Sequence, residues 1–352
     1  MSQAQTQVGV RVTLTLLIGA SLGILAACSQ ASSPAPASAS PPASTAGAGA
    51  KVAVVYGSLA GNQLPLWVAQ DAGIFRQNGI DASLQLLTGS AAIATLVSGE
   101  MQVAQVGGSE VLNAAANGVD MAFLATISPR FDFIFVGAPG IKSFADLKGK
   151  TVGIAPVGGT IYIATRIVFK RAGLDFDKDV NLVQMGVTQE RVAALEGGSI
   201  QATMVDVPLA RTLKPKGYNF LYDMAAEGIP NAGNSVVAKR SWLSANREAA
   251  QRYIDSIMEG MARTRQDKAL ATATYKKFTK SGNDTEAQDT YEYFLPAFQG
   301  VPYPKPEQLT DTRDIMAEVN PKVRSLDLAS LLDDSFVKNA VARGVGTSGA
   351  TR

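Results

Sequence analysis

The phrase LVSGEMQVAQV, from Leu96 to Val106, returns later in the chain as LEGGSIQATMV, from Leu195 to Val205. In each copy a helical pattern ends, a glycine that can adopt a left-handed turn follows, and a short apolar strand begins. Any helix–glycine–strand junction would share part of this likeness, but other glycines correspond as well. The aligned pairs are Leu96 with Leu195, Gly99 with Gly198, Met101 with Ile200, Gln102 with Gln201 and Val106 with Val205; the other glycines are Gly57, Gly89 and Gly107–Gly108 in one half and Gly158–Gly159 and Gly186 in the other. The repeat predicts two lobes of one design.

Strands and helices alternate through both halves, which is typical of a largely parallel sheet covered by helices. In the first lobe the patterns predict strands at 51–56, 82–87 and 103–106 and helices at 64–75, 91–97 and 110–116. In the second lobe they predict strands at 151–155, 181–185 and 202–205 and helices at 161–172 and 189–195. The predicted fold class is therefore α/β.

Two apolar stretches between the halves, 121–127 and 131–136, are expected to be strands that cross from one lobe to the other. From Ser244 onward long helical patterns appear, at 248–278 and 285–295, and the prolines at 302, 304 and 306 break them. These helices are expected to pack back onto the first lobe. We therefore expect residues 51–136 and 237–352 to form lobe 1 and residues 137–236 to form lobe 2.

The first fifty residues differ from the rest of the chain. Arg11 precedes an apolar run at 12–27, which is shorter than a membrane-spanning helix requires and indicates an export signal. The run ends in Leu25-Ala-Ala-Cys28, which resembles a bacterial lipobox, so residues 1–27 are expected to be a lipoprotein signal peptide and Cys28 the lipidated residue. An uncleaved anchor with an incidental cysteine is the alternative. Residues 28–50 are mostly Ser, Ala, Pro, Gly and Thr, which predicts a disordered linker.

The composition excludes several functions. A net charge of +2 with scattered Lys and Arg argues against nucleic acid as a partner. The chain has no histidine and a single cysteine, so the commonest general base is missing and neither an intrachain disulfide nor a Cys cluster for zinc can form. We expect no metal, no cofactor and no catalysis.

Several segments resemble the solute-binding proteins of the nitrate, sulfonate, taurine and thiamine-precursor ABC importers. PLWVAQDAGIFRQNGI, from Pro65 to Ile80, is similar to the opening of their first lobe, and SFADLKGKTVG, from Ser143 to Gly153, is similar to the entry into their second. The repeated phrase resembles their paired helix-to-strand turns, although the family usually has Asp where this chain has Gln102 and Gln201. The resemblance implies a type II periplasmic-binding-protein fold, with two α/β lobes joined by two crossing strands and a small-molecule ligand in the cleft. It also implies an ABC permease and its ATPase as partners.

In open α/β sheets a ligand lies beyond the carboxyl ends of the strands, where helix N-termini favour anions. Small and polar residues stand at several such places, although a Ser or Thr before a helix is more often an ordinary N-cap. The candidate ligand contacts on this ground are Ser58, Asn62, Ser90, Gly108, Ser109, Glu110, Gly159 and Thr160.

Four further candidates, and Glu110 as well, each have a plain structural alternative. Arg130 could clamp a carboxylate or sulfonate, or it could be a solvated surface residue. Tyr56 and Tyr162 could stack on a ring or simply pack in the core. Asp206 resembles the end of the family's second-lobe strand, which faces the cleft, or it starts a helix. Glu110 would prefer a ligand with an amino or ring N–H group, or it caps its own helix.

The residues and the resemblance together predict a monomeric, membrane-anchored lipoprotein, periplasmic or otherwise outside the cytoplasm. It is expected to close about a hinge on a small organic anion, a sulfonate or carboxylate, and deliver it to a permease. A heteroaromatic precursor contacted by Tyr56, Glu110 and Tyr162 is the alternative ligand. A ligand-sensing lipoprotein is a further alternative, and an enzyme of this fold is disfavoured because, as the resemblance implies, such enzymes depend on histidine.

Overall fold

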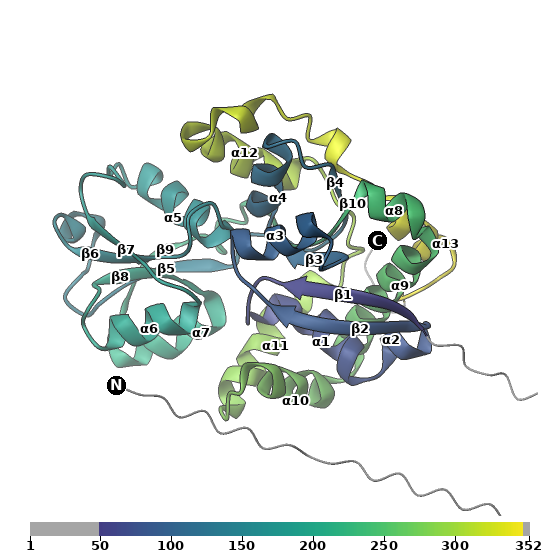
Figure 1. The fold of residues 1–352 in the computed structure, drawn as a ribbon. Helices are drawn as coiled ribbons and strands as arrows, with labels where there is room; N and C mark the ends of the chain where they lie inside the picture. The colour runs from purple at the N-terminus through teal and green to yellow at the C-terminus, as the bar shows by residue number, and fades with distance from the viewer. Residues whose placement is uncertain (1–48, 348–352) are drawn as a thin grey trace, which may run out of the picture. The chain divides into compact units, whose positions relative to one another are not determined.

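The computed structural model describes residues 49–347, which contain two five-stranded sheets (Figure 1). The first sheet has the strand order β2-β1-β3-β10-β4, and the second has the order β7-β6-β8-β5-β9. In each sheet the first three strands in this order are parallel, and the fourth is antiparallel to both of its neighbours. The two sheets thus repeat one topology, which confirms the predicted α/β fold with two lobes.

Eight of the ten strands follow the predicted ones with small shifts of their ends, and the strands at 219–223 and 230–239 were not predicted. The strands of the first sheet are β1 (Ala50–Tyr56), β2 (Ile80–Leu86), β3 (Val103–Val106), β4 (Met121–Arg130) and β10 (Pro230–Lys239). Those of the second sheet are β5 (Phe133–Gly137), β6 (Thr151–Ile154), β7 (Asn181–Gln184), β8 (Ala202–Asp206) and β9 (Asn219–Asp223).

Thirteen α-helices and five short 3-10 helices accompany the strands within residues 49–347. The α-helices are α1 (Leu64–Asp71), α2 (Ile74–Gln77), α3 (Ser90–Ser98), α4 (Gly108–Ala116), α5 (Thr160–Arg171), α6 (Thr188–Glu196), α7 (Val207–Leu213), α8 (Arg240–Ala245), α9 (Arg247–Gln266), α10 (Lys268–Thr279), α11 (Asp284–Phe298), α12 (Glu307–Val319) and α13 (Ser335–Ala342). The 3-10 helices are η1 (Gly61–Gln63), η2 (Phe144–Leu147), η3 (Lys214–Lys216), η4 (Pro321–Ser325) and η5 (Ala329–Leu331).

The chain passes between the sheets twice. It leaves the first sheet at Arg130 and enters the second at Phe133, so the two expected crossing strands are β4 and β5. It returns between β9 and β10, and the two passages are joined where the Phe131 amide donates to the Ile229 carbonyl at 3.1 Å. These two passages connect the lobes.

The repeated phrase has the same structure in both lobes. Gly99 (φ +85°) and Gly198 (φ +75°) follow the ends of α3 and α6 in the left-handed region, as predicted. The Gln102 side chain accepts from the Ala53 amide at 2.8 Å and donates to the Gly99 carbonyl at 3.1 Å. Gln201 likewise accepts from the Thr151 amide and donates to the Gly198 carbonyl, both at 3.0 Å. An amide provides the donor and the acceptor that this junction uses, and an Asp carboxylate would provide only acceptors.

Two of the long helical patterns are interrupted. The pattern at 64–75 forms α1 and α2, because Gly73 adopts φ +71° between them. The pattern at 248–278 forms α9 and α10, since Asp267 leaves the helical conformation and its side chain accepts from the Leu270 amide. The third pattern, at 285–295, lies within α11, and α9 packs against α1 on the first sheet as expected.

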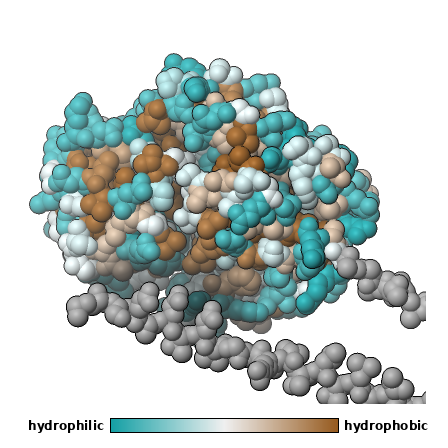
Figure 2. All heavy atoms as spheres, viewed as in Figure 1, coloured by the Kyte–Doolittle hydropathy of each residue, from teal (hydrophilic) through white to brown (hydrophobic). Residues whose placement is uncertain are grey.

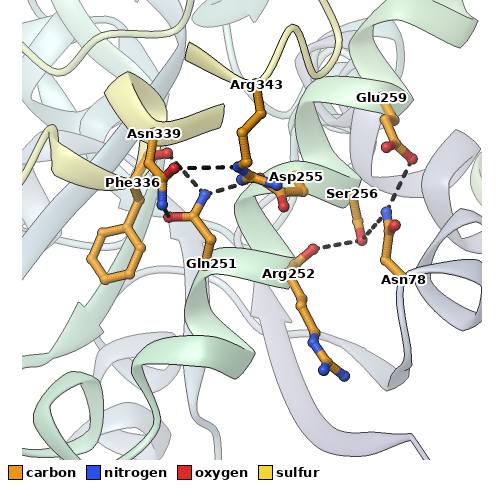
Figure 3. A network of polar contacts seen from close by, with 9 residues as sticks. All are labelled: Asn78, Gln251, Arg252, Asp255, Ser256, Glu259, Phe336, Asn339 and Arg343. Atoms are coloured by element: carbon orange, nitrogen blue, oxygen red, sulfur yellow. Dashed lines mark hydrogen bonds and ion pairs between the residues drawn. The ribbon is translucent and has the colours of Figure 1, made fainter. Parts of the chain in front are cut away.

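A polar network ties α13, near the C-terminus, to α9 (Figure 3). Arg343 donates to Asp255 at 2.6 Å and to the Asn339 side chain at 3.2 Å. Gln251 donates to Asp255 at 2.9 Å and to the Phe336 carbonyl at 3.0 Å, and it accepts from Asn339 at 3.2 Å. The network closes on itself and holds α13 and Arg343 against α9.

Large apolar side chains fill the space between the sheets and the helices, among them the fully buried Trp67, Phe75, Phe135 and Phe169. The face in Figure 2 is a mixture of hydrophilic surface and separate apolar patches. Within residues 49–347 no helix is both long enough and apolar enough to cross a membrane. The expected signal peptide (1–27), the lipidated Cys28 and most of the expected linker (28–50) lie outside the described residues, and the exact lobe boundaries stay a prediction.

Candidate functional site

A pocket lies between the two sheets, and its empty space is about 830 Å³ when the open solvent at its mouth is counted. Both lobes contribute to its wall, mostly through loops that follow the carboxyl ends of strands. The lining residues from the first lobe are Gly57, Ser58, Leu59, Ala60, Asn62, Gln63, Thr88, Gly89, Gln105, Val106, Gly107, Glu110 and Gly233; those from the second are Phe133, Ala155, Pro156, Gly159, Thr160, Ile161, Gly186, Val187, Thr188, Gln189, Arg191 and Asp206. This is the position at which open α/β sheets hold their ligands.

Glu110, in the first turn of α4, joins the lobes across this pocket. Its Oε1 accepts from the Thr160 amide at 3.2 Å, and its Oε2 accepts from the Thr160 hydroxyl at 2.9 Å. Ser109 lies behind this pair, with its hydroxyl 2.8 Å from Glu110 Oε2 and 3.0 Å from Thr160 Oγ1. The carboxylate thus lies at the N-termini of two helices, α4 and α5, where the helix dipoles favour a negative charge.

Small residues allow the lobes to approach so closely. A Cβ on Gly107 would lie 1.7 Å from Thr160 Oγ1, so any larger residue would push the Glu110–Thr160 contact apart. Gly89 has φ +59°, and a Cβ there would lie 3.3 Å from Pro156 of the other lobe. The two lobes are therefore in close contact at the loops that contain Gly89 and Gly107.

A buried arginine and a carboxylate occupy the second-lobe wall. Arg191 is 1% exposed, and it donates to the Gly186 carbonyl at 2.7 Å, to Thr188 Oγ1 at 2.9 Å and to the Met204 carbonyl at 3.4 Å. Burial lowers the pKa of Arg191 to about 10, so it stays charged at neutral pH. Burial raises the pKa of Asp206 to about 6, although its Oδ1 accepts from the Leu209 amide at 3.1 Å.

Three buried amide side chains form part of the first-lobe wall. Asn62, Gln63 and Gln105 are 8%, 2% and 0% exposed, and in each the side-chain carbonyl oxygen has no hydrogen-bond partner among the described residues. Leaving one buried acceptor unpaired costs about 1–3 kcal/mol. Three such atoms along one pocket are typical of a wall that is completed by a ligand.

Seven of the sequence-predicted residues gather at this site. Ser58, Asn62, Glu110, Gly159, Thr160 and Asp206 line the pocket, and Ser109 hydrogen-bonds to two of them from behind. Their ligand contacts stay a prediction, but the structure brings them together from both lobes.

Five predicted residues do not line this pocket. Ser90 lines a second, more open pocket beside it, which also touches Glu110. Gly108 packs under α12, where a Cβ would lie 2.7 Å from Leu309. Tyr56 is buried in edge-to-face contact with Trp67, with ring centroids 6.0 Å apart, and burial raises its pKa. The ring of Tyr56 is therefore part of the hydrophobic core and does not line the pocket.

The two remaining residues also have partners of their own. Tyr162 packs edge-to-face on Phe176 at 5.6 Å and accepts a hydrogen bond from Arg166. Arg130 donates to the buried Asp132 at 3.2 Å, and its guanidinium lies 5.5 Å from the centre of the Tyr293 ring. Arg130 thus lies at the passage between the lobes, as its place in the sequence suggested, but it forms an ion pair with Asp132 there.

Three buried polar residues of the pocket wall are among those that the sequence did not predict. Arg191 is buried on α6 together with Val192 and Leu195. An arginine among the apolar residues of a helix is a pattern that could have identified it from the sequence. Gln105 is the one polar residue of β3, in the middle of the repeated phrase. Gln63 stands just before the helix at Leu64 and offered no signal. Among the described residues no group of three or more acidic or Cys side chains is placed to hold a metal ion.

Residues 60–269 match the family model described as NMT1/THI5 like. The chain belongs to the NMT1/THI5-like family. Its fold is that of the solute-binding proteins of ABC importers, as the resemblance implied.

Several proteins are similar to this chain at low sequence identity. A protein of Brucella abortus (strain 2308) that is named a candidate binding protein is 25% identical over 230 residues, which cover 63% of this chain and 70% of the relative. A solved structure from Bordetella bronchiseptica RB50 has a TM-score of 0.75 at 19% identity and covers 84% of this chain and 98% of that one. The alkanesulfonate-binding protein SsuA of Xanthomonas axonopodis pv. citri, bound to MOPS, has a TM-score of 0.66 at 16% identity, covering 81% and 98%. At these identities the solved structures establish the fold and leave the ligand open.

Proposed function

We propose that this NMT1/THI5-like protein is the lipid-anchored solute-binding component of an ABC importer, which captures a small molecule between its lobes and delivers it to a permease. The observation that carries the proposal is the pocket wall itself. Polar groups of both lobes face one enclosed space, and several of them are buried without partners. A ligand that pairs with them stabilises the closed arrangement by contacts that the open one lacks.

Binding rather than catalysis agrees with the chemistry of the wall. The chain has no histidine, and its one cysteine is Cys28, outside the described residues. The pocket holds two carboxylates, but Glu110 is engaged with Thr160 and Asp206 caps α7, so neither is placed as a free general base. The lining supports holding a molecule.

The lipid anchor is proposed on the sequence before the folded lobes. Cys28 would carry the lipid, and residues 29–48 would link it to the first strand. Labelled palmitate should enter the wild-type protein and not a Cys28→Ala variant. Labelling that persists in the variant would refute the anchor.

The sequence allows two ligand classes. An organic anion is supported by the fold shared with the alkanesulfonate-binding protein and by the charge of Arg191 in the wall. A heteroaromatic donor ligand is supported by Glu110 at the pocket, where its carboxylate prefers an N–H group. Both classes are compatible with the proposed function.

The proposed function is tested by incubating residues 29–352, stripped of bound small molecules, with the low-molecular-weight fraction of a bacterial extract. After gel filtration, mass spectrometry should find at least one compound enriched with the protein and released from it with unchanged mass. A Gly107→Val variant is the control, because the added side chain meets Thr160 and should abolish enrichment. A compound that returns with an altered mass, or no enrichment in wild type, would contradict the proposal.

A further inference from the structure

The first-lobe wall of the pocket contains buried hydrogen-bond acceptors that have no partner among the described residues. They are the side-chain carbonyl oxygens of Asn62, Gln63 and Gln105. Gln105 keeps its orientation through its Nε2, which donates to the Tyr253 hydroxyl at 3.0 Å and leaves the carbonyl oxygen without a partner. A ligand must offer N–H or O–H groups to satisfy these atoms.

The positive charge of the pocket is largely engaged. Among the described lining residues Arg191 is the one cation, and three of its five N–H groups are donated to the protein's own Gly186, Thr188 and Met204. Its Nε has no partner among the described residues, so two N–H groups, one on Nε and one on Nη1, remain for a ligand, and both N–H groups of Nη2 are engaged. Such an arginine positions the 186–188 loop and provides no bidentate fork for a carboxylate or sulfonate.

The helix starts that would attract an anion already hold carboxylates of the chain. Glu110 accepts from the Thr160 amide at the start of α5, and Asp206 accepts from the Leu209 amide in the first turn of α7. Before α6 the Gly186 amide donates to Glu190 at 3.0 Å. An incoming anion would compete with these carboxylates and meet one positive and two negative side chains in the wall.

We propose that the pocket selects small neutral or cationic molecules that carry at least two N–H or O–H donors, and that it rejects sulfonates and carboxylates. This inference rests on the proposed function. It assigns Gln63, Gln105 and Asn62 as the acceptors that read the ligand, and Glu110 and Asp206 as the charges that disfavour an anion.

The test uses residues 29–352 and a panel of compounds matched in pairs on the same carbon skeleton, such as benzamidine and benzamide against benzenesulfonate and benzoate. At pH 7.5, thermal shift should show stabilisation, and calorimetry should show binding, only for the compounds of the panel that carry an amidine, amide or amine group. Stabilisation by the anionic half alone would overturn the inference and leave the proposed function standing. Binding by neither half would count against both.

Two matched variants test whether a side chain of the pocket wall determines which ligands bind. Gln63→Leu keeps the approximate size of a buried side chain that has an unpaired oxygen, whereas Gln77→Leu alters an exposed amide on α2. We expect Gln63→Leu to weaken binding of the best donor compound about tenfold without lowering the melting temperature of the ligand-free protein. Gln77→Leu should bind as wild type does. Equal affinity in Gln63→Leu and wild type would overturn the assigned acceptor.

Discussion

Glu110 of the first lobe and Thr160 of the second are joined by two hydrogen bonds, one to the backbone amide and one to the side-chain hydroxyl of Thr160. The two residues stand in the first turns of α4 and α5, so one carboxylate serves helices that belong to different sheets. The contact makes the closed pocket depend on residues that also line it.

Thr160→Val tests this contact, because it removes the hydroxyl and keeps the shape of the side chain. We expect ligand affinity to fall by about 1 kcal/mol, roughly fivefold, since the closed form loses one interlobe hydrogen bond. Thr165→Val is the control, because Thr165 is buried in the same helix and its hydroxyl bonds only to the Ile161 carbonyl. Calorimetry that finds equal losses in both variants would show that the hydroxyl has no interlobe role.

Asp206 predicts a defined pH dependence of stability. Burial raises its pKa to about 6 from 3.8, so the folded state binds more protons than the unfolded state between these values. Stability contributed by this group therefore falls as pH rises from about 4 to 6 and is constant above. The Asp206→Asn variant lacks this titration. Between about pH 4 and pH 6 its free energy of unfolding, measured by urea denaturation, should therefore rise relative to that of wild type by on the order of 1–3 kcal/mol.

Asp146 provides a control of opposite sign for that measurement. Hydrogen bonds from the Lys142 amide, and from the side chain and amide of Ser143, lower the pKa of this exposed carboxylate. Asp146→Asn should therefore lose stability relative to wild type as pH rises through the titration range of the unfolded carboxylate. The same slope in both variants would mean that the pH effect is not local.

The buried carboxylate at the passage between the lobes should be important for stability. Asp132 is 3% exposed, accepts from Ser128, Arg130 and the Tyr293 hydroxyl, and its pKa is raised by burial. Tyr293→Phe removes one donor from it and should lower the free energy of unfolding by about 1 kcal/mol. Tyr291→Phe, a nearby tyrosine whose hydroxyl bonds to the Arg265 carbonyl, shows how much of the loss is general to a tyrosine of α11. A loss no larger than that of Tyr291→Phe would argue against a special role for the passage.

The ion pair in Figure 3 should hold the end of the chain more firmly than a surface pair does. Arg343→Ala removes the partner of the largely buried Asp255 and should cost about 1–3 kcal/mol. Arg263→Ala breaks a pair with Asp267 on the exposed side of the same helix and should cost less than about 0.5 kcal/mol. Thermal melts that rank these variants the other way would contradict the role given to the network.

The fold was largely predictable from the sequence because its signals are local. Gly99 and Gly198 mark helix ends at which the backbone enters the left-handed region. Short, mostly apolar runs such as 103–106 favour buried strands because they are too short for helices and alternate with helical patterns. The interruption of the helical pattern at Asp267 was missed, since nothing apolar changes there and the side chain caps the next helix.

The site was predictable only where strand ends supplied a rule. Ser58, Glu110 and Thr160 follow strands and were found in this way, whereas Asp206 was found through the family resemblance. Tyr56 and Arg130 also stand at strand ends, but the Tyr56 ring packs on Trp67 and the Arg130 guanidinium pairs with Asp132. A strand-end position does not show whether a side chain faces the pocket or a protein partner. Unpaired amide atoms likewise appear only once the lobes are assembled.

The central claim, that a ligand holds two lobes together, is tested most directly by a distance across the pocket. In a Cys28→Ser background, spin labels at Ser98→Cys on α3 and Val183→Cys on β7 report on one exposed site of each lobe. Without ligand, double electron–electron resonance should show a broad distribution of distances between the two labels. With the compound that stabilises the protein most, the mean distance should become shorter and the distribution narrower. A control pair within the first lobe, Ser98→Cys with Asn117→Cys, should not change. Identical distributions across the lobes with and without a bound compound would contradict the account.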